Sequence, residues 1–208
     1  MLTVQKIQSE IFNSNVYTIT SSEHEEVFLI DCGGFEPVLD SLPPTAVVSG
    51  IFLTHYHYDH IYFIKDWIVR YPDVKFYGSQ ITLEGLSNPK RNLSFYHDDP
   101  IAVTDVNYQT ITDEVRVTLF DYISFTAFET EGHCEGSLSF LIDNYIFTGD
   151  AIIPNIPIVT KLKTGNKEKA KDSVRKIKSL LNDEFIICPG HLETFKYQDV
   201  KWNLYLDD

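Results

Sequence analysis

Four side chains that bind metal ions well lie within one short stretch of this sequence, residues 55–60. The imidazoles of His55, His57 and His60 accompany the carboxylate of Asp59, in a chain that has seven histidines altogether. Side chains alternate along an extended loop, so His55 and His57 point to one side, while Asp59 and His60 begin a helix and turn to a neighbouring position. Imidazole nitrogens and carboxylate oxygens suit zinc, iron or manganese. The pattern therefore predicts that one pair holds one metal ion and the other pair holds a second.

Three further metal-competent side chains, those of His133, Asp150 and His191, each follow an apolar run and a glycine. Glycine lets the backbone approach a site closely and adopt conformations that other residues avoid. Taken singly, a histidine at a strand end is usually structural, and an aspartate after glycine is usually a turn residue. The plan that all three share favours a common role with residues 55–60 over the alternative, a solvated histidine-rich loop.

In this order the motifs resemble those of the metallo-β-lactamase superfamily, in which H-x-H-x-D-H precedes a Gly-His, an aspartate and a final histidine. The resemblance runs over nearly the whole chain, and the order of five parts is specific although each part alone is not. It implies an α/β fold, a four-layer αββα sandwich with metal ions at one edge between two sheets. It also implies a ligand set, which is His55, His57 and His133 for a first metal, Asp59, His60 and His191 for a second, and Asp150 as the bridge.

The branch of the superfamily follows from the same residues. A bridging aspartate beside both Asp59 and His60 looks like glyoxalase II (hydroxyacylglutathione hydrolase) and related thioesterases and lactonases. Lactamases typically have a cysteine or a non-bridging residue where Asp150 stands. Residues 85–94 also resemble the middle of small glyoxalase II-like proteins.

Three features depart from the usual pattern. Ile61 and Tyr62 follow His60, where family members usually have small residues, and residues 131–137 read EGHCEGS instead of the usual PGHTPGS. The chain also ends soon after His191, where glyoxalase II places its glutathione-binding helices. The sequence therefore does not decide whether glutathione is used.

The chemistry expected of such a site is hydrolysis. Two metal ions about 3.5–4 Å apart bind a bridging water and lower its pKa towards ~7. The resulting hydroxide attacks a carbonyl carbon, and a metal stabilises the oxyanion. We expect Asp59 to act as a catalytic residue that orients the water through its second oxygen. The predicted cofactors are two divalent metal ions, zinc first, with iron or manganese as alternatives.

The function predicted first is a metallo-hydrolase that acts on a small-molecule substrate, a thioester or a lactone. The alternative is a mononuclear iron enzyme of the persulfide dioxygenase type, which uses the same fold with fewer metal ligands engaged. A nuclease of the superfamily is disfavoured by the acidic composition and by the absence of an additional RNA-gripping domain. A non-enzymatic protein is disfavoured because all seven ligand positions are filled.

The elements that must position these side chains are strands in runs with helices between them. Apolar runs bounded by turn residues predict strands at residues 16–20, 27–32, 50–54, 75–77, 115–120, 123–130, 138–142, 145–148 and 185–188. Helical spacing predicts helices at residues 60–70, 79–86, 167–181 and 199–206, and the third carries an apolar stripe. Residues 87–107 are polar and irregular, as in a loop over a site. Strands covered by helices indicate a layered α/β protein, with one domain over residues 1–208.

Basic residues gather after the strand that precedes Asp150. Lys161 and Lys163 lie in a predicted loop, where they either attract an anionic substrate or are ordinary surface side chains. The basic residues of the helix over residues 167–181 fit a solvated face opposite its apolar stripe.

Three other residues have a candidate role. Asp31 ends a predicted strand and is a candidate for the buried acceptor that a metal-binding imidazole needs on its other nitrogen, with a surface turn as the alternative. His97 lies in the predicted loop and either reaches the site or stays at the surface. Cys134, beside His133, is either a small filler or a substrate contact.

Composition limits the partners. The formal net charge is −13, and such a surface repels phosphate backbones, so nucleic acid is not expected as a partner. Three widely spaced cysteines without a CxxC pair fit a reducing compartment. Neither a secretory leader nor a stretch of about 18 apolar residues occurs, so we expect a cytoplasmic protein without a membrane partner.

Overall fold

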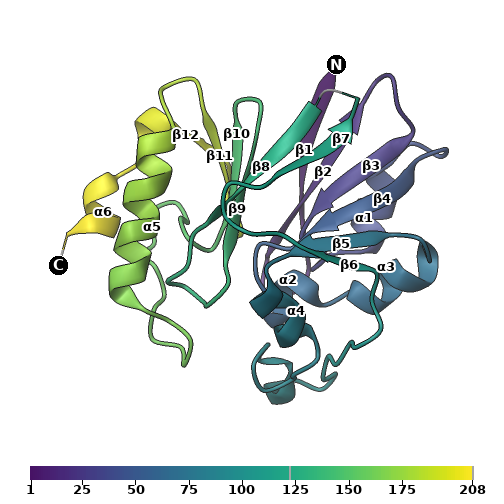
Figure 1. Cartoon of the computed structure of the whole chain (residues 1–208), viewed down its shortest axis with the longest axis horizontal. Coiled ribbons are helices and arrows are strands. Elements are labelled where there is room, and N and C mark those ends of the chain that lie inside the picture. The colour runs from purple at the N-terminus through teal and green to yellow at the C-terminus, as the bar shows by residue number, and fades with distance from the viewer. Residues whose placement is uncertain (122, 208) are drawn as a thin grey trace. The chain divides into compact units, whose positions relative to one another are not determined.

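The computed structural model describes residues 1–121 and 123–207. The chain divides into two compact units, residues 1–111 and 112–208, and each contains one six-stranded sheet together with helices (Figure 1). The predicted α/β class is therefore confirmed. The single domain over residues 1–208 stays a prediction, and each unit is described by itself.

The sheet of the first unit has the strand order β1-β2-β3-β4-β5-β6. Strands β1, β2 and β3 pair antiparallel, whereas β3 to β6 pair parallel. The strands are β1 (Leu2–Gln8), β2 (Asn15–Ser21), β3 (Glu26–Ile30), β4 (Val47–Phe52), β5 (Lys75–Gly78) and β6 (Tyr108–Thr110). The helices are α1 (Glu36–Ser41), α2 (Tyr58–Ile61), α3 (Ile64–Arg70), α4 (Gln80–Leu86) and the 3-10 turn η1 (Ser94–Tyr96).

Strands β3 and β4 form the centre of this unit. Leu29 and Ile51 are fully buried and pack in one core with Trp67 of α3. Strands buried on both faces are rich in apolar residues, as the buried parts of β3 and β4 are. Because β3 and β4 are parallel, their carboxyl ends share one edge of the sheet, where Asp31 follows β3 and residues 53–60 follow β4.

The sheet of the second unit has the order β12-β11-β10-β9-β8-β7. Its strands are β7 (Arg116–Phe120), β8 (Ile123–Glu129), β9 (Leu138–Ile142), β10 (Tyr145–Gly149), β11 (Ile186–Pro189) and β12 (Phe195–Lys196). Strands β8 and β10 are both antiparallel to β9, and β10 is parallel to β11. Strands β8, β10 and β11 therefore run in one direction, so the residues after them share an edge.

Helix α5 (Lys167–Leu180) covers the core of the second unit, with η2 (Tyr197–Asp199) and α6 (Trp202–Leu206) after it. The predicted stripe is confirmed, because Ala170, Val174 and Ile177 are buried. Asn166 caps the helix by accepting a hydrogen bond from the Lys169 N–H at 3.0 Å, as N-cap residues do.

Two of the predicted helices differ from the structure. The helix expected over residues 60–70 is broken into α2 and α3, because the Phe63 N–H leaves the helical pattern and donates to the Cys32 carbonyl at 3.1 Å. The helix expected over residues 199–206 is divided between η2 and α6. The strand expected over residues 27–32 stops at Ile30, since Asp31 has a φ of +61°. Among the described residues, no helix is both long and apolar enough to cross a membrane.

Candidate metal centre

In the first unit, the candidate ligands are arranged around the buried carboxylate of Asp31. Its Oδ1 accepts from the Thr54 N–H at 2.7 Å, and its Oδ2 accepts from the Thr54 hydroxyl at 2.8 Å. The same Oδ2 lies 2.8 Å from Nδ1 of His60. The prediction of a buried acceptor at Asp31 is confirmed, and the alternative of a surface turn is excluded because the residue is 1% exposed.

This network fixes the protonation of two imidazoles. A carboxylate only accepts, so Nδ1 of His60 carries a proton, and in the neutral ring Nε2 then has the lone pair. The Thr54 hydroxyl uses its single proton on Asp31, so it accepts from Nδ1 of His55, 3.0 Å away. Nε2 of His55 therefore also has its lone pair. In both rings Nε2 is therefore the nitrogen left to bind a metal ion.

The four polar side chains of residues 55–60 converge within the first unit. The ring centroid of His55 lies 4.7 Å from that of His57 and 4.2 Å from that of His60. Nε2 of His60 is 3.6 Å from Oδ2 of Asp59. Two ligand atoms about 2.0–2.1 Å from one tetrahedral zinc lie about 3.4 Å apart. The spacing of this pair fits two ligands of a single ion.

The backbone around Asp59 is held from the β1–β2 and β3 sides. The Ser14 hydroxyl donates to the Asp59 carbonyl at 2.7 Å, and the Cys32 N–H donates to the His60 carbonyl at 2.8 Å. A Cβ at Gly33 would lie 1.8 Å from the Asp59 carbonyl oxygen. Only glycine fits there, so the close approach that positions α2 depends on Gly33.

In the second unit, Asp150 lies between the other two candidate ligands. Its Oδ2 is 3.5 Å from Nε2 of His133 and 3.6 Å from Nε2 of His191. Nδ1 of His133 lies 2.9 Å from the Val159 carbonyl, which only accepts, so Nδ1 donates and Nε2 has the lone pair in the neutral ring. The three donor atoms have the spacing of ligands that share metal ions.

Glycines and strand ends set this arrangement. Asp150 and His191 follow the parallel strands β10 and β11, whose ends are joined by a hydrogen bond from the Gly190 N–H to the Gly149 carbonyl at 2.8 Å. Gly132, before His133, has a φ of +131°, and a Cβ there would lie 2.3 Å from Cα of Ala170. The first turn of α5 thus packs directly on the backbone that presents His133.

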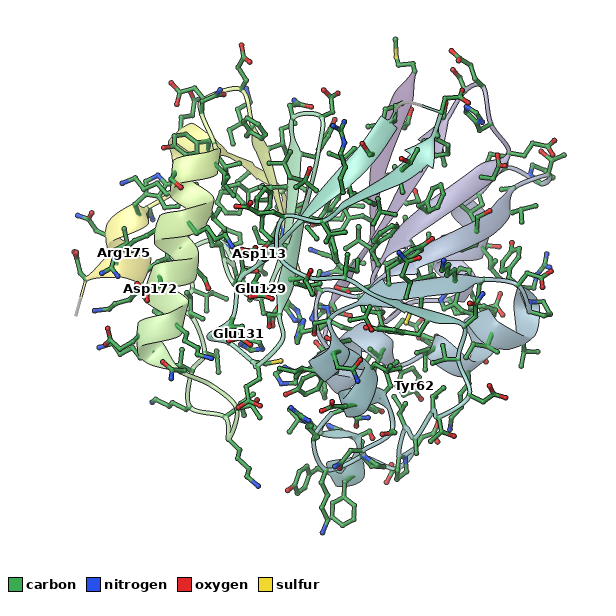
Figure 2. All side chains as sticks on the ribbon, in the orientation of Figure 1. Tyr62, Asp113, Glu129, Glu131, Asp172 and Arg175 are labelled. Carbon is green, nitrogen blue, oxygen red and sulfur yellow. The ribbon has the colours of Figure 1, made fainter. Side chains whose placement is uncertain are left out.

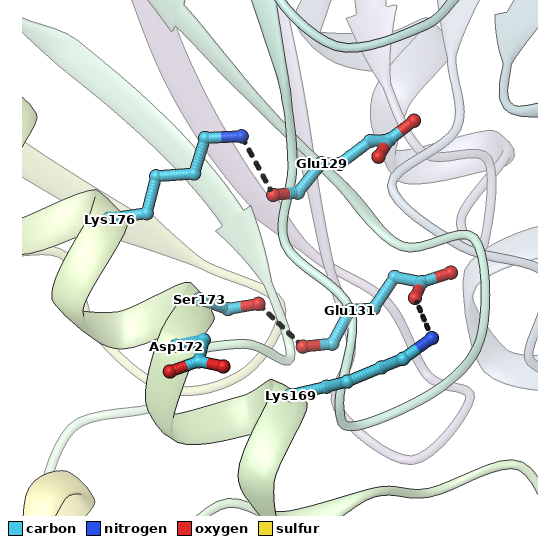
Figure 3. Close-up of a pocket in the computed structure, with 6 residues that line it drawn as sticks. All are labelled: Glu129, Glu131, Lys169, Asp172, Ser173 and Lys176. Carbon is cyan, nitrogen blue, oxygen red and sulfur yellow. Dashed lines mark hydrogen bonds and ion pairs between the residues drawn. The ribbon is translucent and has the colours of Figure 1, made fainter.

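Helix α5 is also fastened to the end of β8 by polar contacts (Figure 3). The Ser173 hydroxyl donates to the Glu131 carbonyl at 2.6 Å, and Nζ of Lys169 lies 2.6 Å from Oε2 of Glu131. Partial burial alone would raise the pKa of Glu131, but the bonds from Lys169 and the Gly136 N–H outweigh it and lower that pKa. Ser173, Lys169 and Glu131 line an open pocket of about 230 Å³, together with Glu129, Asp172 and Lys176.

A second carboxylate, that of Asp113, forms an ion pair with a lysine farther along the same helix. Asp113 pairs with Lys176, which also donates to the Glu129 carbonyl. Figure 2 shows Asp113, Glu129 and Glu131 beside α5. The predicted solvated basic face holds for exposed members such as Lys167, but Lys171 is only 7% exposed. The basic residues of α5 therefore include side chains that fix the helix in place.

The remaining predicted residues take ordinary positions in their own units. Lys161 and Lys163 are exposed in the loop after β10. The Cys134 thiol is buried and donates to the Glu135 carbonyl at 3.3 Å, as a small filler does. His97 stacks on Tyr58, the residue between His57 and Asp59.

Cys32 and Cys188 do not provide a reactive thiolate. Burial is the largest cause that raises the pKa of the Cys32 thiol, and the carboxylates of Asp31 and Asp66 raise it further. Burial also raises the pKa of the Cys188 thiol. Raised thiol pKa values make both residues poor nucleophiles.

Comparison with known proteins decides the family. Residues 10–191 match the family model described as the metallo-beta-lactamase superfamily. The chain belongs to this superfamily. Among curated relatives, it is 27% identical over 198 residues to a hydroxyacylglutathione hydrolase of Tolumonas auensis, and the match covers 94% of this chain and 67% of the relative. The resemblance to the glyoxalase II-like branch is thereby confirmed.

Solved structures share the fold of this superfamily member. The crystal structure of the BLEG-1 B3 metallo-beta-lactamase matches with a TM-score of 0.82 and 23% identity, and 95% of each chain is covered. The structure of TTHA1623 in a di-iron-bound form matches with a TM-score of 0.78 and 20% identity, over 94% of this chain and 96% of the other. At these identities the likeness establishes the fold alone.

Some residues that shape the site were not predicted. The Thr54 hydroxyl, the Ser14 hydroxyl and the Val159 carbonyl all hold candidate ligands or their backbone. Thr54 had a signal in the sequence, since it is a polar residue at the end of an apolar strand directly before His55. Val159 had none, because its contact is made by the backbone.

Proposed function

We propose that this chain is a metal-dependent hydrolase of small thioesters or lactones. The observation that carries the proposal is the orientation of three imidazoles: Nδ1 of His55, His60 and His133 lies at an acceptor, so that Nε2 is the nitrogen left to bind a metal ion. One orientation shared by three histidines from two units favours a common role over a chance group. Membership of the superfamily and the hydroxyacylglutathione hydrolase relative support the same function.

The proposed ligand set joins the candidates of the two units. It comprises His55, His57 and His133 for one ion, Asp59, His60 and His191 for the other, and Asp150 as a bridge. Nitrogen and oxygen donors of this kind suit zinc, iron and manganese. The di-iron-bound neighbour shows that this fold accommodates two metal ions in that protein.

In the proposed site, the metal ions and the residues around them would have different roles. Bound metal ions supply a hydroxide at neutral pH and polarise the carbonyl of the substrate. Asp59 orients the attacking water through its second carboxylate oxygen. Asp31 keeps His60 oriented and, through Thr54, does the same for His55, so the negative charge of one buried carboxylate supports two imidazoles.

Metal analysis combined with activity assays tests the proposal. We expect about two equivalents of zinc, iron or manganese per chain, and hydrolysis of a thioester or lactone that a chelator abolishes and added metal restores. Asp150→Asn should lose metal and activity, whereas Asp172→Asn, an exposed aspartate on α5, should lose neither. One iron per chain with oxygen consumption would instead favour the oxygenase, and no bound metal at all would refute both.

Lys161 and Lys163 are proposed to attract an anionic substrate, because they are exposed cations in a protein of formal net charge −13. Replacing both with glutamine should lower kcat/KM for a succinyl thioester roughly three-fold or more at low salt, and leave the acetyl thioester unchanged. Lys167→Gln, an exposed lysine at the start of α5, is the control. Equal effects on both thioesters would contradict this role.

A further inference from the structure

An aromatic cluster in the first unit has no part in the function proposed so far. Tyr58 and His97 stack with ring centroids 4.1 Å apart and planes 14° apart. The Phe12 ring lies 5.3 Å from His97 and 6.0 Å from Tyr58, tilted against both. Tyr62, labelled in Figure 2, meets Tyr58 edge-on at 5.1 Å. Phe12, Tyr58 and His97 together are called the aromatic shelf.

Phe12 is held in an unfavourable state. Its side chain is 58% exposed, so it contributes little to the core, and its φ of +52° is left-handed. That conformation costs an ordinary side chain about 1–2 kcal/mol. Phe12 and Asn13, with a φ of +57°, form the turn between β1 and β2, where Gly, Asn or Asp is the usual residue. A phenyl ring at this position is not needed for the turn and points to another role for residue 12.

The loop that carries Phe12 is rigidly tied. The Ser9 N–H donates to the Ser14 carbonyl at 2.7 Å across the loop, and the Ser9 hydroxyl donates to the Gly33 carbonyl at 2.6 Å. The Ser14 hydroxyl reaches the carbonyl of Asp59 at 2.7 Å. The loop is thus fixed to the turn that presents a candidate metal ligand.

The shelf also stands directly on that turn. Tyr58 is the residue between His57 and Asp59, so its backbone belongs to the metal-ligand segment. A substrate whose scissile carbonyl lies at Asp59 would extend its next group over the neighbouring side chains. Phe12 is an exposed apolar residue of the first unit whose ring packs beside Tyr58 of this turn.

Charges around the shelf limit what it binds. Burial, Tyr62, Asp99 and Asp98 together raise the pKa of the Tyr58 hydroxyl to about 12. Both of these carboxylates are exposed next to His97, so an anionic group is repelled. A cation cage requires several ring faces around one point, whereas here Tyr58 and His97 cover each other and Phe12 presents a single open face.

We propose that the aromatic shelf binds an uncharged aromatic or alkyl group of the substrate beside the metal-ligand turn. This inference rests on the proposed function, and it narrows the substrates to thioesters or lactones with a bulky apolar acyl group. Stacking on an open phenyl ring stabilises such a group through buried apolar area and favourable ring geometry.

Acyl selectivity tests the shelf. We expect the metal-loaded protein to prefer a phenylacetyl over an acetyl thioester of the same thiol by roughly ten-fold in kcat/KM. Phe12→Asn should reduce that ratio to about three-fold or less, while its melting temperature stays unchanged or rises, because asparagine tolerates the left-handed backbone. A structural role for Phe12 would instead lower the melting temperature and leave the ratio unchanged.

The matched control is Tyr96→Ala. Tyr96 is 70% exposed in η1 and its ring contacts Phe95, so the ratio should not change. A ratio near one in the wild type, or a ratio that Phe12→Asn leaves intact, would overturn the shelf even if hydrolysis is confirmed.

A binding measurement separates this inference from the proposed function. Ligand-observed NMR with phenylacetamide, an uncharged probe, should report binding to the wild type and to Tyr96→Ala, and weaker binding to Phe12→Asn. If no thioester or lactone is hydrolysed, the proposed function fails, and this titration still decides the shelf. Tighter binding of phenethylammonium than of phenylacetamide would contradict the proposal, because the shelf would then prefer a cation to an uncharged group.

Discussion

Asp31 is the residue on which the contacts of the first unit converge. Its carboxylate accepts two bonds from Thr54 and one from His60. Hydrogen bonds to a charged group contribute about 1.5–3 kcal/mol each. Together they outweigh the strain of the left-handed backbone, which aspartate tolerates better than most residues.

Replacing Asp31 with asparagine should weaken metal binding more than folding. The amide keeps the shape of the side chain but offers a single acceptor atom, so either the Thr54 N–H loses its acceptor, or the Thr54 hydroxyl and Nδ1 of His60 both lose theirs. We expect metal affinity to fall about 10–100-fold and the free energy of unfolding to fall by about 2 kcal/mol. Zinc titration against a competing chelator and urea denaturation measure the two effects.

The control for this change is Asp143→Asn. Asp143 is also left-handed, with a φ of +52°, but it is exposed between β9 and β10. In Asp143→Asn, the metal affinity and the free energy of unfolding should both equal the wild-type values within experimental error. An unchanged zinc affinity in Asp31→Asn would show that the tautomer of His60 does not depend on the carboxylate.

For single residues, the sequence indicated the candidate metal ligands but not all of the groups that hold them in place. Each candidate ligand has its own local signal, because it belongs either to the histidine-rich segment of residues 55–60 or to a position after an apolar run and a glycine. Asp31 could be nominated because it ends an apolar strand. The acceptor for His133 could not, because it is a backbone carbonyl, at Val159, whose position depends on the tertiary course of a loop.

Among the helices and strands, α5 is the one whose contacts most clearly position a candidate ligand. Its apolar stripe packs into the core, its polar contacts reach β8, and its first turn lies against Gly132. The stripe was predictable, since it needs only the helical period. The contact at Gly132 was not, because a glycine before a histidine does not reveal what packs against it.

A methyl group at Gly132 should displace α5 from His133. In Gly132→Ala the new Cβ would meet backbone atoms of Ala170 at 2.3 Å, at a φ of +131° that alanine avoids. We expect a loss of about 2–4 kcal/mol in the free energy of unfolding, together with weaker metal binding. Gly34→Ala, where the nearest atoms are 3.5 Å away, should change stability by less than about 1 kcal/mol. Equal stability of both variants would contradict the packing.

Helix α5 should also make stability depend on pH in the acid range. Partial burial alone would raise the pKa of Asp113, but bonds from Lys176 and the Glu129 N–H outweigh it and place that pKa below its ordinary value of 3.8. A lowered folded-state pKa stabilises the fold above the ordinary value, and this contribution is lost as the pH falls through the folded-state pKa.

Lys176→Met isolates this contribution. Because Asp113 is over one third exposed, solvent screens the pair, and we expect a loss of only about 0.5–1 kcal/mol at pH near 6. The difference from the wild type should shrink as the pH is lowered below 3.8. Urea denaturation at both pH values measures it, with Lys167→Met as a control for removing an exposed charge. A difference that does not depend on pH would assign the effect to packing.

The sequence pattern failed to predict two edge strands and the break within one helix. The edge strands β1 and β6 were not predicted, because their side chains are largely exposed or half-buried and their order comes from pairing with β2 and β5. The break between α2 and α3 was missed for a similar reason, since the Cys32 carbonyl that captures the Phe63 N–H lies on a distant segment. The hydrophobic period of a segment predicts that a helix or strand forms there. Its hydrogen-bonding partners elsewhere in the chain determine where that helix or strand ends.

For the molecule as a whole, the proposed ligand set has a thermodynamic consequence. It takes His55, His57, Asp59 and His60 from one compact unit and His133, Asp150 and His191 from the other. A metal ion that binds ligands from both units only in the folded protein stabilises both at once. Metal ions also neutralise part of the formal net charge of −13, which otherwise opposes the compact state.

Removing metal should therefore lower the melting temperature and reduce the cooperativity of unfolding. At a free metal concentration about 1,000 times Kd, binding adds about 4 kcal/mol, which corresponds to roughly 8–16 °C for a protein of this size. Differential scanning calorimetry should show one transition for the metal-loaded protein, and a lower, broader or divided transition after chelation. Asp150→Asn should resemble the chelated wild type even when metal is added, because the proposed bridge is gone. Identical transitions with and without metal would mean that the two sets of ligands do not act on common ions.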